Sequence, residues 1–282
     1  MPHSIRVLLA ESLGTFILIL FGCGAVHASV VWGAQTGVWQ VAIVWGAGVA
    51  LAAYCVGSVS GAHINPAITI TLAVWGRFPW SKVGPYVLVQ LLGAILAAAS
   101  LFVIFGPSLR IKEEQIGVKR GELGSIVTAS CYGEFYPMPA GALTPDGKWS
   151  DENWKMFSER VTDVEAFFAE VVCTAILALV VFAVTDPKNT GAPAPYLGPL
   201  VCGLTVAALI SVIGPLTGCC LNPARDFGPR LFTYFAGWGT AALPGPNEHG
   251  VVTVYIVAPI LGAILGGGIY DKLIRPAYVT KS

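Results

Sequence analysis

The segment GAHINPA at residues 61–67 returns in altered form as GCCLNPA at residues 218–224. In both copies, an Asn-Pro-Ala triplet follows a short stretch that suits extended backbone. Asn is a favoured helix N-cap and Pro is favoured at the first helical position, so each triplet predicts a helix start. At about 1.5 Å per residue, the apolar stretch from Asn65 to Trp75 would cover only about half of a membrane core of about 30 Å. We therefore expect two half helices that enter a membrane without crossing it.

These triplets belong to a longer internal repeat. AESLGT at residues 10–15 resembles AEVVCT at residues 169–174, and LGAIL occurs at residues 92–96 and again at residues 261–265. The three matches follow one another in the same order and at a nearly constant separation. Such collinear self-similarity indicates that one unit was duplicated, so the two halves of the chain should share one structure.

The composition is that of a membrane protein. Of the 282 residues, 55% are hydrophobic and only 11% are charged, whereas a soluble domain carries about a quarter charged residues. No Asp, Glu, Lys or Arg occurs from Ser12 to Gly76, and more than half of the charged residues lie between Arg110 and Glu165. The formal net charge is zero, which argues against a nucleic-acid partner. A cytosolic enzyme is equally disfavoured.

The hydrophobic runs predict an all-α membrane protein with six transmembrane helices and two re-entrant half helices. A helix needs about 20 apolar residues to span a bilayer. We place the spans at residues 7–32, 38–58, 83–105, 163–185, 196–214 and 251–273. The chain then forms one channel domain over residues 1–282, with repeat one at 5–106, an external loop at 107–162 and repeat two at 163–275. The first hydrophobic run is too long for a cleavable signal core and is interpreted as span one.

The basic residues of the short loops set the orientation. Cytoplasmic loops carry an excess of Lys and Arg. With six spans, one side collects Arg6, Arg77, Lys82, Lys188, Lys272, Arg275 and Lys281. We expect that side, with both termini, to be cytoplasmic. Because each repeat has three spans, the second copy enters the membrane from the opposite side, which makes the repeat inverted.

The half helices should meet with their N-termini at mid-membrane, around a pore. Irregular backbone at that depth is tolerated where it lines a cavity. The side-chain amides of Asn65 and Asn222 would then donate hydrogen bonds to a solute at the central constriction, and the positive helix ends would oppose cations. The alternative is that each Asn only caps its helix. We expect acceptor ladders from the backbone carbonyls of Gly61, Ala62, His63, Ile64, Gly218, Cys220 and Leu221.

Few charges remain at membrane depth, and each suggests a role. Arg225 projects from the first turn of the second half helix, and such an Arg normally faces a cavity. The alternatives are that it extends to the interface or pairs with the adjacent Asp226. Glu11 and Glu170 occupy matching repeat positions and should accept hydrogen bonds from backbone N–H groups of the extended segments. A proton relay in an active transporter would use the same residue type, so that alternative stays open.

No cluster of residues suits catalysis or metal binding. Zinc, phosphate-loop and nucleophile-elbow patterns do not occur in the sequence. We therefore expect no enzymatic activity, no cofactor and no bound metal.

The duplicated Asn-Pro-Ala segments, with SGAH before the first and Arg225 after the second, resemble the major intrinsic protein (aquaporin) family. TGCCLNPARDFGPR at residues 217–230 is similar to the glycerol-facilitator, or aquaglyceroporin, branch. The resemblance covers about residues 5–274. It implies a homotetramer in the cell membrane with one pore per subunit. Each pore would passively conduct glycerol, related small neutral solutes and water, and would exclude ions and protons.

By position, the resemblance assigns an outer selectivity filter to Trp45, Ile210, Cys219 and Arg225. Trp45 suits packing against the carbon side of a polyol, while Arg225 would bind its hydroxyl groups. A small residue is common in the family where Ile210 stands, and an aromatic one where Cys219 stands. Water-selective members usually carry His in place of Ile210. Water-selective and urea-type channels on the same fold remain as alternatives, and Asp226 is expected to support the structure.

Overall fold

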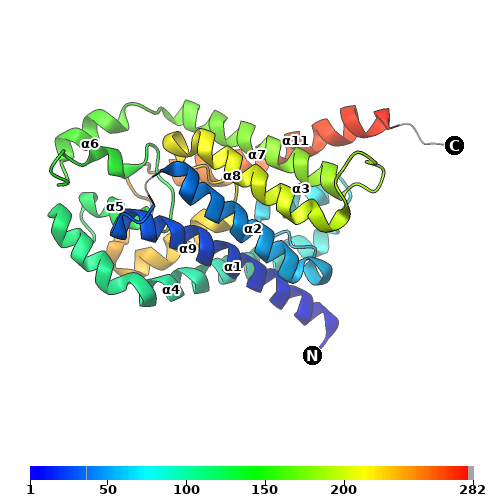
Figure 1. Cartoon of the computed structure of the whole chain (residues 1–282), viewed down its shortest axis with the longest axis horizontal. Coiled ribbons are helices and arrows are strands. Elements are labelled where there is room, and N and C mark those ends of the chain that lie inside the picture. The colour runs from blue at the N-terminus through cyan, green and yellow to red at the C-terminus, as the bar shows by residue number, and fades with distance from the viewer. Residues whose placement is uncertain (36, 279–282) are drawn as a thin grey trace.

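The computed structural model describes residues 1–35 and 37–278, so Lys281 lies outside the described residues. Most of the described chain is helical (Figure 1). Six helical segments in this part of the chain are long and apolar enough to cross a membrane. They are His3–Trp32, Val38–Ser60, Trp80–Ile116, Asp163–Thr185, Pro195–Thr217 and Gly250–Ala277. The predicted six-span architecture is therefore confirmed.

Eight main helices build the two repeats. The first repeat contains α1 (His3–Trp32), α2 (Val38–Ser60), α3 (Pro66–Val74) and α4 (Val83–Ile116). The second contains α7 (Asp163–Thr185), α8 (Gly198–Thr217), α9 (Pro223–Thr233) and α11 (Ala258–Ile269). The sixth span begins with α10 (Gly250–Val252), and π-helical turns flank α11 at Thr253–Val257 and Tyr270–Ile274. The half helices α3 and α9 begin directly after the predicted caps.

The packing repeats with the sequence. Helix α1 packs against α2 and α4, and α7 packs in the same way against α8 and α11. The half helices cross between the repeats, since α3 packs against α11 and α9 packs against α4. Figure 1 also shows the start of α1 and the segment after α11 at the end opposite α5 (Ile126–Ala129) and α6 (Asp151–Ser158). The exchange of half helices places both of them inside one bundle.

The two repeats make backbone contact where α2 crosses α8. A Cβ added at Gly46 would overlap the carbonyl oxygen of Gly203, and a Cβ at Gly203 would overlap that of Gly46. Small residues allow this close approach of membrane helices. The contact fixes the second spans of both repeats at the centre of the molecule.

Helix α4 is longer than the sequence predicted. Instead of ending near Phe105, it continues through Pro107 to Ile116. The extension is stabilised because Leu109 and Ile116 are buried and Glu113 accepts hydrogen bonds from Arg120 and Thr128 at 2.8–3.2 Å. The segment predicted as a loop at 107–162 therefore starts as helix and continues as folded chain with α5 and α6.

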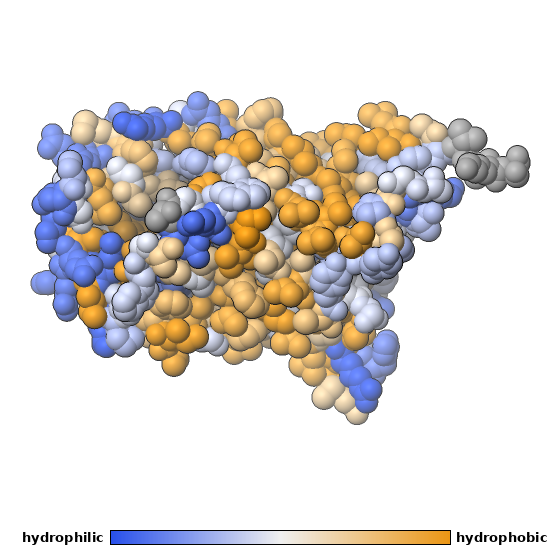
Figure 2. All heavy atoms as spheres, in the orientation of Figure 1, coloured by the Kyte–Doolittle hydropathy of each residue, from blue (hydrophilic) through white to orange (hydrophobic). Residues whose placement is uncertain are grey.

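The outside of the bundle is apolar in its middle and hydrophilic at its ends (Figure 2). Large exposed side chains on the spans include Leu88, Leu96, Val103, Phe168, Val212 and Leu265. The hydrophilic surface at one end covers the region of α5 and α6. An apolar surface of this extent suits contact with lipid.

Candidate functional site

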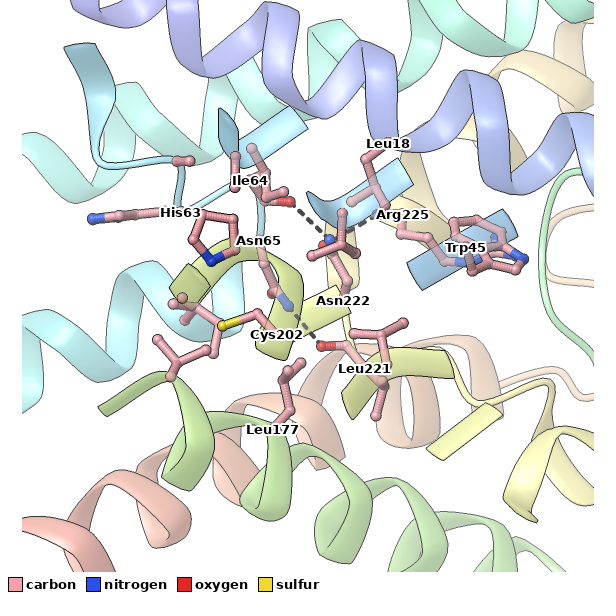
Figure 3. Close-up of a pocket in the computed structure, with 18 of the residues that line it drawn as sticks. Leu18, Trp45, His63, Ile64, Asn65, Leu177, Cys202, Leu221, Asn222 and Arg225 are labelled. Carbon is pink, nitrogen blue, oxygen red and sulfur yellow. Dashed lines mark hydrogen bonds between the residues drawn. The ribbon is translucent and has the colours of Figure 1, made fainter. Parts of the chain in front are cut away.

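A cavity of about 290 Å³ is lined mainly by the two segments that precede the half helices and by side chains of α1, α2, α7 and α8 (Figure 3). Every residue predicted for the filter, the central constriction and the carbonyl ladders lines it. These are Trp45, Gly61, Ala62, His63, Ile64, Asn65, Ile210, Gly218, Cys219, Cys220, Leu221, Asn222 and Arg225. Apolar side chains from the spans complete the lining, among them Leu18, Leu177, Val181 and Val206. Glu11, Glu170 and Asp226 are not part of the lining.

Both asparagines cap their half helices. The side-chain oxygen of Asn65 accepts from the backbone N–H of Ala67 at 2.8 Å, and that of Asn222 accepts from Ala224 at 3.1 Å. Each cap has extended backbone, as an N-cap requires. The triplets thus start the helices as predicted.

The same asparagines also join the two repeats. The amide nitrogen of Asn65 donates to the carbonyl of Leu221 at 2.8 Å, and that of Asn222 donates to the carbonyl of Ile64 at 2.8 Å (Figure 3). Each amide group has two N–H bonds, so one remains for a solute. The carbonyls of Ile64 and Leu221, which the sequence predicted as ladder members, each accept one bond from the opposite repeat and keep a second lone pair for a solute.

The extended segments share an unusual backbone. Both begin with a glycine at positive φ, Gly61 at 84° and Gly218 at 78°. Non-glycine residues follow in the left-handed region, such as Ala62 at 48° and Cys219 at 61°. Such conformations cost about 1–3 kcal/mol each and persist only where the surroundings enforce them.

Carbonyl groups along these segments are left without protein partners. In the described chain, the carbonyls of Gly61, Ala62 and His63 accept no hydrogen bond from the protein, and the same holds for Gly218 and Cys220. All of these residues line the cavity. The segments can therefore offer acceptors to a solute.

Glu170 holds the second extended segment. Its two oxygens accept from the backbone N–H groups of Cys220 and Leu221 at 2.9 and 3.0 Å, and from the Thr217 hydroxyl at 2.6 Å. The carboxylate is fully buried behind the segment. These are the bonds expected of a supporting carboxylate.

Glu11 holds the first segment through fewer bonds. Its Oε1 accepts from the backbone N–H of Ile64 and from the Gln90 side chain, the latter at 2.8 Å. Its buried Oε2 has no hydrogen-bond partner in the described structure. Gln90 also donates to the Thr69 hydroxyl at 3.0 Å and was not predicted from the sequence.

Arg225 is buried at the part of the cavity that Trp45 and Glu134 also line, with 3% of its side chain exposed. It forms an ion pair with Glu134 and donates to the carbonyl of Tyr132 at 2.8 Å. Its guanidinium carbon lies 4.2 Å from the centroid of the Trp45 ring. The two alternative positions of Arg225 are therefore not observed. Its side chain is buried and does not extend to the membrane–water interface, and it does not pair with Asp226.

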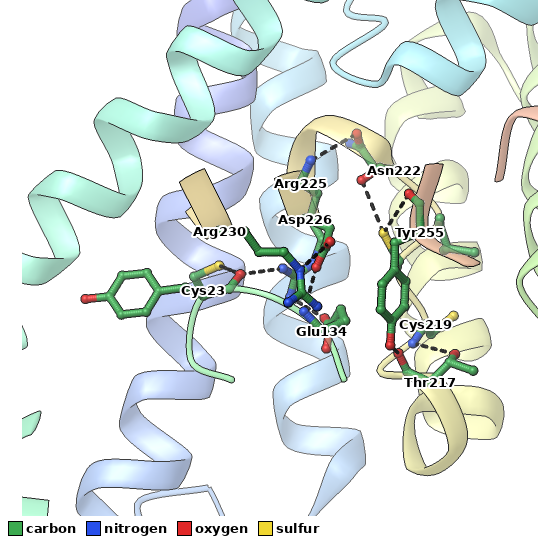
Figure 4. Close-up of polar contacts among 12 residues, drawn as sticks. Cys23, Glu134, Thr217, Cys219, Asn222, Arg225, Asp226, Arg230 and Tyr255 are labelled. Carbon is green, nitrogen blue, oxygen red and sulfur yellow. Dashed lines mark hydrogen bonds and ion pairs between the residues drawn. The ribbon is translucent and has the colours of Figure 1, made fainter. Parts of the chain in front are cut away.

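Asp226 instead anchors the segment that carries Glu134 (Figure 4). Its Oδ1 accepts from the backbone N–H of Glu134 at 2.6 Å, and its Oδ2 accepts from Arg230 at 2.7 Å. Arg230 in turn donates to the carbonyl of Ala242 at 2.8 Å. Residues 132–134 are thereby fixed beside Arg225.

Glu134 is a cavity-lining residue that sequence reasoning missed. It is the one charged residue between Glu122 and Asp146, a signal that could have identified it. The pair with Arg225 leaves no net charge at this point of the lining. The positive ends of α3 and α9 then contribute positive potential near the cavity.

Comparison with known proteins agrees with this geometry. The model of the major intrinsic protein family matches residues 1–270. A glycerol uptake facilitator protein of Pseudomonas aeruginosa is 44% identical over 94% of this chain and 88% of its own length. A propanediol uptake facilitator of Citrobacter freundii is 41% identical over 94% and 91%, respectively.

The fold is similar to that of a solved structure. The aquaglyceroporin from Plasmodium falciparum matches with a TM-score of 0.79 and 24% identity, over 96% of this chain and 97% of that chain. The chain belongs to the major intrinsic protein family.

Proposed function

We propose that the protein is a passive channel for glycerol and related small neutral solutes, with water as a second permeant. The observation that carries the proposal is the two-sided lining of the cavity. Free carbonyls and the amides of Asn65 and Asn222 lie along one path, and apolar side chains such as Leu177 and Val206 complete the wall. A polyol presents hydroxyl groups and carbon atoms in the same way. The relatives named glycerol uptake facilitators support this solute class.

Residue roles follow from this geometry. Asn65 and Asn222 would donate their remaining N–H groups at the centre, and the ladder carbonyls would accept from hydroxyl groups. Trp45, Ile210, Cys219 and Arg225 would form the outer filter, where the indole meets carbon atoms. Conduction of this kind requires no covalent step, so no enzymatic activity is part of the proposal.

Ion exclusion would arise from desolvation and from the helix ends. A cation entering the cavity loses water and meets the N-termini of α3 and α9 instead of carboxylates. Glu134, the one acidic side chain in the described lining, is already paired with Arg225. The same reasoning applies to a proton carried along a water chain.

A diol channel is a second candidate. The relatives named propanediol uptake facilitators are 40–41% identical, nearly as similar as the glycerol facilitators. The apolar Ile210 in the lining suits a solute with one hydroxyl fewer than glycerol. A urea-type channel would use the same carbonyls, whereas a water-selective one would gain from a polar group at Ile210.

Proteoliposome flux measurements separate these functions. Vesicles with and without the protein are exposed to gradients of glycerol, propanediol, urea or sucrose, and their volume is followed by stopped-flow light scattering. Glycerol entry that is independent of pH and sodium gradients supports the channel. Entry that requires either gradient would establish a coupled transporter. Water flux without solute flux would establish the water-selective alternative.

The assembly and orientation are also proposals. We propose a homotetramer in the cell membrane with both termini in the cytoplasm. Arg77 and Arg275 lie at one end, 3.9 and 2.7 Å from Asp186, which supports a common basic side. Cross-linking in native membranes tests the tetramer. Impermeant labelling of a cysteine added at either terminus tests the orientation, because labelling from outside would contradict it.

A further inference from the structure

The indole of Trp45 lies directly against α1 at Gly22. A Cβ added at Gly22 would be almost equally close to Cδ2, Cε3 and Cζ3 of the indole. All three approaches fall well inside 3.0 Å, a limit that real Cβ atoms essentially never cross. These are consecutive ring atoms at similar distances, so the added carbon would sit over the ring face, not beside its edge. Only glycine leaves space for the indole at this position.

Helix α1 is tethered to α2 and to the first extended segment on the side that faces Trp45. Near its start, a Cβ at Gly14 would lie 2.7 Å from Val56 and 2.8 Å from Ile64, so α1 packs against α2 and the extended segment along its length. Its Glu11 is also bonded to Ile64 and Gln90. Close-packed helices of this kind transmit an added volume to whichever neighbour can move.

The movable neighbour is the indole. Trp45 lines the cavity, so displacement away from α1 moves it toward the open space and toward Arg225, whose guanidinium carbon is 4.2 Å from the ring centroid. Any side chain at residue 22 would thus narrow the cavity at the level of the proposed filter.

In the second repeat, the larger of the two matching side chains lies on the first span and the smaller one on the second span. Val181 follows Glu170 by the same number of residues as Gly22 follows Glu11, and Cys202 precedes Gly203 as Trp45 precedes Gly46. Both Val181 and Cys202 line the cavity. The first span therefore carries the smaller residue in repeat one and the larger residue in repeat two. This exchange gives the cavity a large aromatic wall at one end only.

We propose that Gly22 is a positioning residue that seats Trp45 against α1 and thereby sets the size of solute that the filter admits. The inference rests on the proposed glycerol channel, since it concerns the aperture of the same pore. Gly22 itself touches no solute and acts through the indole.

The test compares Gly22→Ala with Gly24→Ala in proteoliposomes. Gly24 is on the same helix, and its added Cβ would meet Leu101 at an ordinary 3.5 Å. Because one methyl group in a close-fitting site changes discrimination by about 10–200-fold, we expect Gly22→Ala to lower glycerol permeability at least about tenfold. Water permeability should fall much less, so the glycerol-to-water ratio drops. Gly24→Ala should keep the parent ratio.

The same substitution in a Trp45→Phe variant distinguishes an effect on the pore aperture from an effect on folding. Trp45→Phe lacks Cε3 and Cζ3, two of the three ring atoms that meet the new methyl group. Adding Gly22→Ala to Trp45→Phe should therefore lower glycerol permeability clearly less than adding it to the parent. An equal loss in both backgrounds would overturn the proposal, and so would an unchanged ratio in Gly22→Ala alone. If Gly22→Ala abolishes water flux as well and Trp45→Phe does not restore it, the glycine serves folding and the proposal fails.

Glycerol flux through the unsubstituted protein distinguishes a failure of this inference from a failure of the proposed function. Absence of glycerol flux in the parent would contradict the glycerol channel itself. Glycerol flux in the parent, with no dependence on residue 22, would contradict only the role of Gly22.

Discussion

The two extended segments share one backbone but differ in what surrounds them. Each starts with a positive-φ glycine, ends in a capping Asn and gives one carbonyl to the Asn of the other repeat. Where α9 continues with Arg225 and Asp226, α3 has Ile68 and Thr69. The duplicated backbone thus builds the centre of the cavity, and unduplicated side chains differentiate its two ends.

The supports of the segments differ in the same direction. Glu170 uses both oxygens and binds three donors, whereas one oxygen of Glu11 is unpartnered in the described structure. The second segment also faces residues 132–134 of the connection between repeats, which Asp226 and Arg230 hold in place. Residues at matching positions of the two repeats therefore differ in how many hydrogen bonds they contribute to their segments.

Removing the two glutamates should give the largest contrast. Glu170→Ala leaves three buried donors without a partner, and each such group costs about 1–3 kcal/mol. Glu11→Ala strands chiefly the N–H of Ile64, because Gln90 keeps Thr69. Thermal unfolding in detergent should show the greater loss for Glu170→Ala. Equal losses would mean that the two supports are equivalent.

The Arg225–Glu134 pair comes next, since stranding a buried charge costs about 3–5 kcal/mol. Arg225→Ala leaves the carboxylate of Glu134 in the cavity lining, and we expect cation leak to rise. Adding Glu134→Ala should remove that leak, because both charges are then absent. Cation flux into liposomes measures both, with the exposed Glu122→Ala as control. A leak that persists in the double variant would show that the carboxylate is not its cause.

Substitution of the two asparagines tests whether the repeats are equally stabilised at the position where they are alike. Asn65→Ala and Asn222→Ala each remove a cap worth about 1 kcal/mol and a cross-repeat bond worth about 1 kcal/mol. We expect similar losses of unfolding free energy from both variants. Circular dichroism melts would contradict this symmetry if one substitution were silent while the other was severe.

Gln90→Leu should have the smallest effect, on the order of 1 kcal/mol for the lost hydrogen bonds. It removes a donor to Glu11 and leaves the second repeat untouched. Melting of this variant beside Gln115→Leu, at an exposed residue of the same helix α4, provides the comparison. A loss as large as that of Glu11→Ala would assign the support of the first segment mainly to Gln90.

Local sequence signals were enough for the architecture. The half helices follow from Asn-Pro at Asn65 and Asn222, and the spans follow from uncharged runs bounded by basic loops. Positions matched to the family, such as Trp45 and Arg225, do line the cavity.

Contacts between distant segments could not be predicted in this way. The partner of Arg225 depends on how residues 117–162 fold back over the bundle. The isolated charge of Glu134 singles that residue out in the sequence, but nothing in the sequence pairs it with Arg225. The extension of α4 past Pro107 depends on burial of Leu109 and Ile116 by that same segment. The bonds from Asn65 and Asn222 to opposite carbonyls require the meeting of two chain segments, which residue spacing alone does not reveal.

The cross-repeat bonds of Asn65 and Asn222 bear on how solute can move. Transporters that work by alternating access rock one repeat against the other around a central site. In this chain, two hydrogen bonds and the Gly46–Gly203 backbone contact join the repeats at that location. Rocking would break both bonds and would open the close contact between Gly46 and Gly203. These contacts between the repeats favour a pore that stays open along its whole length while a solute passes. The rate of solute transport is then set by diffusion and not by a conformational cycle.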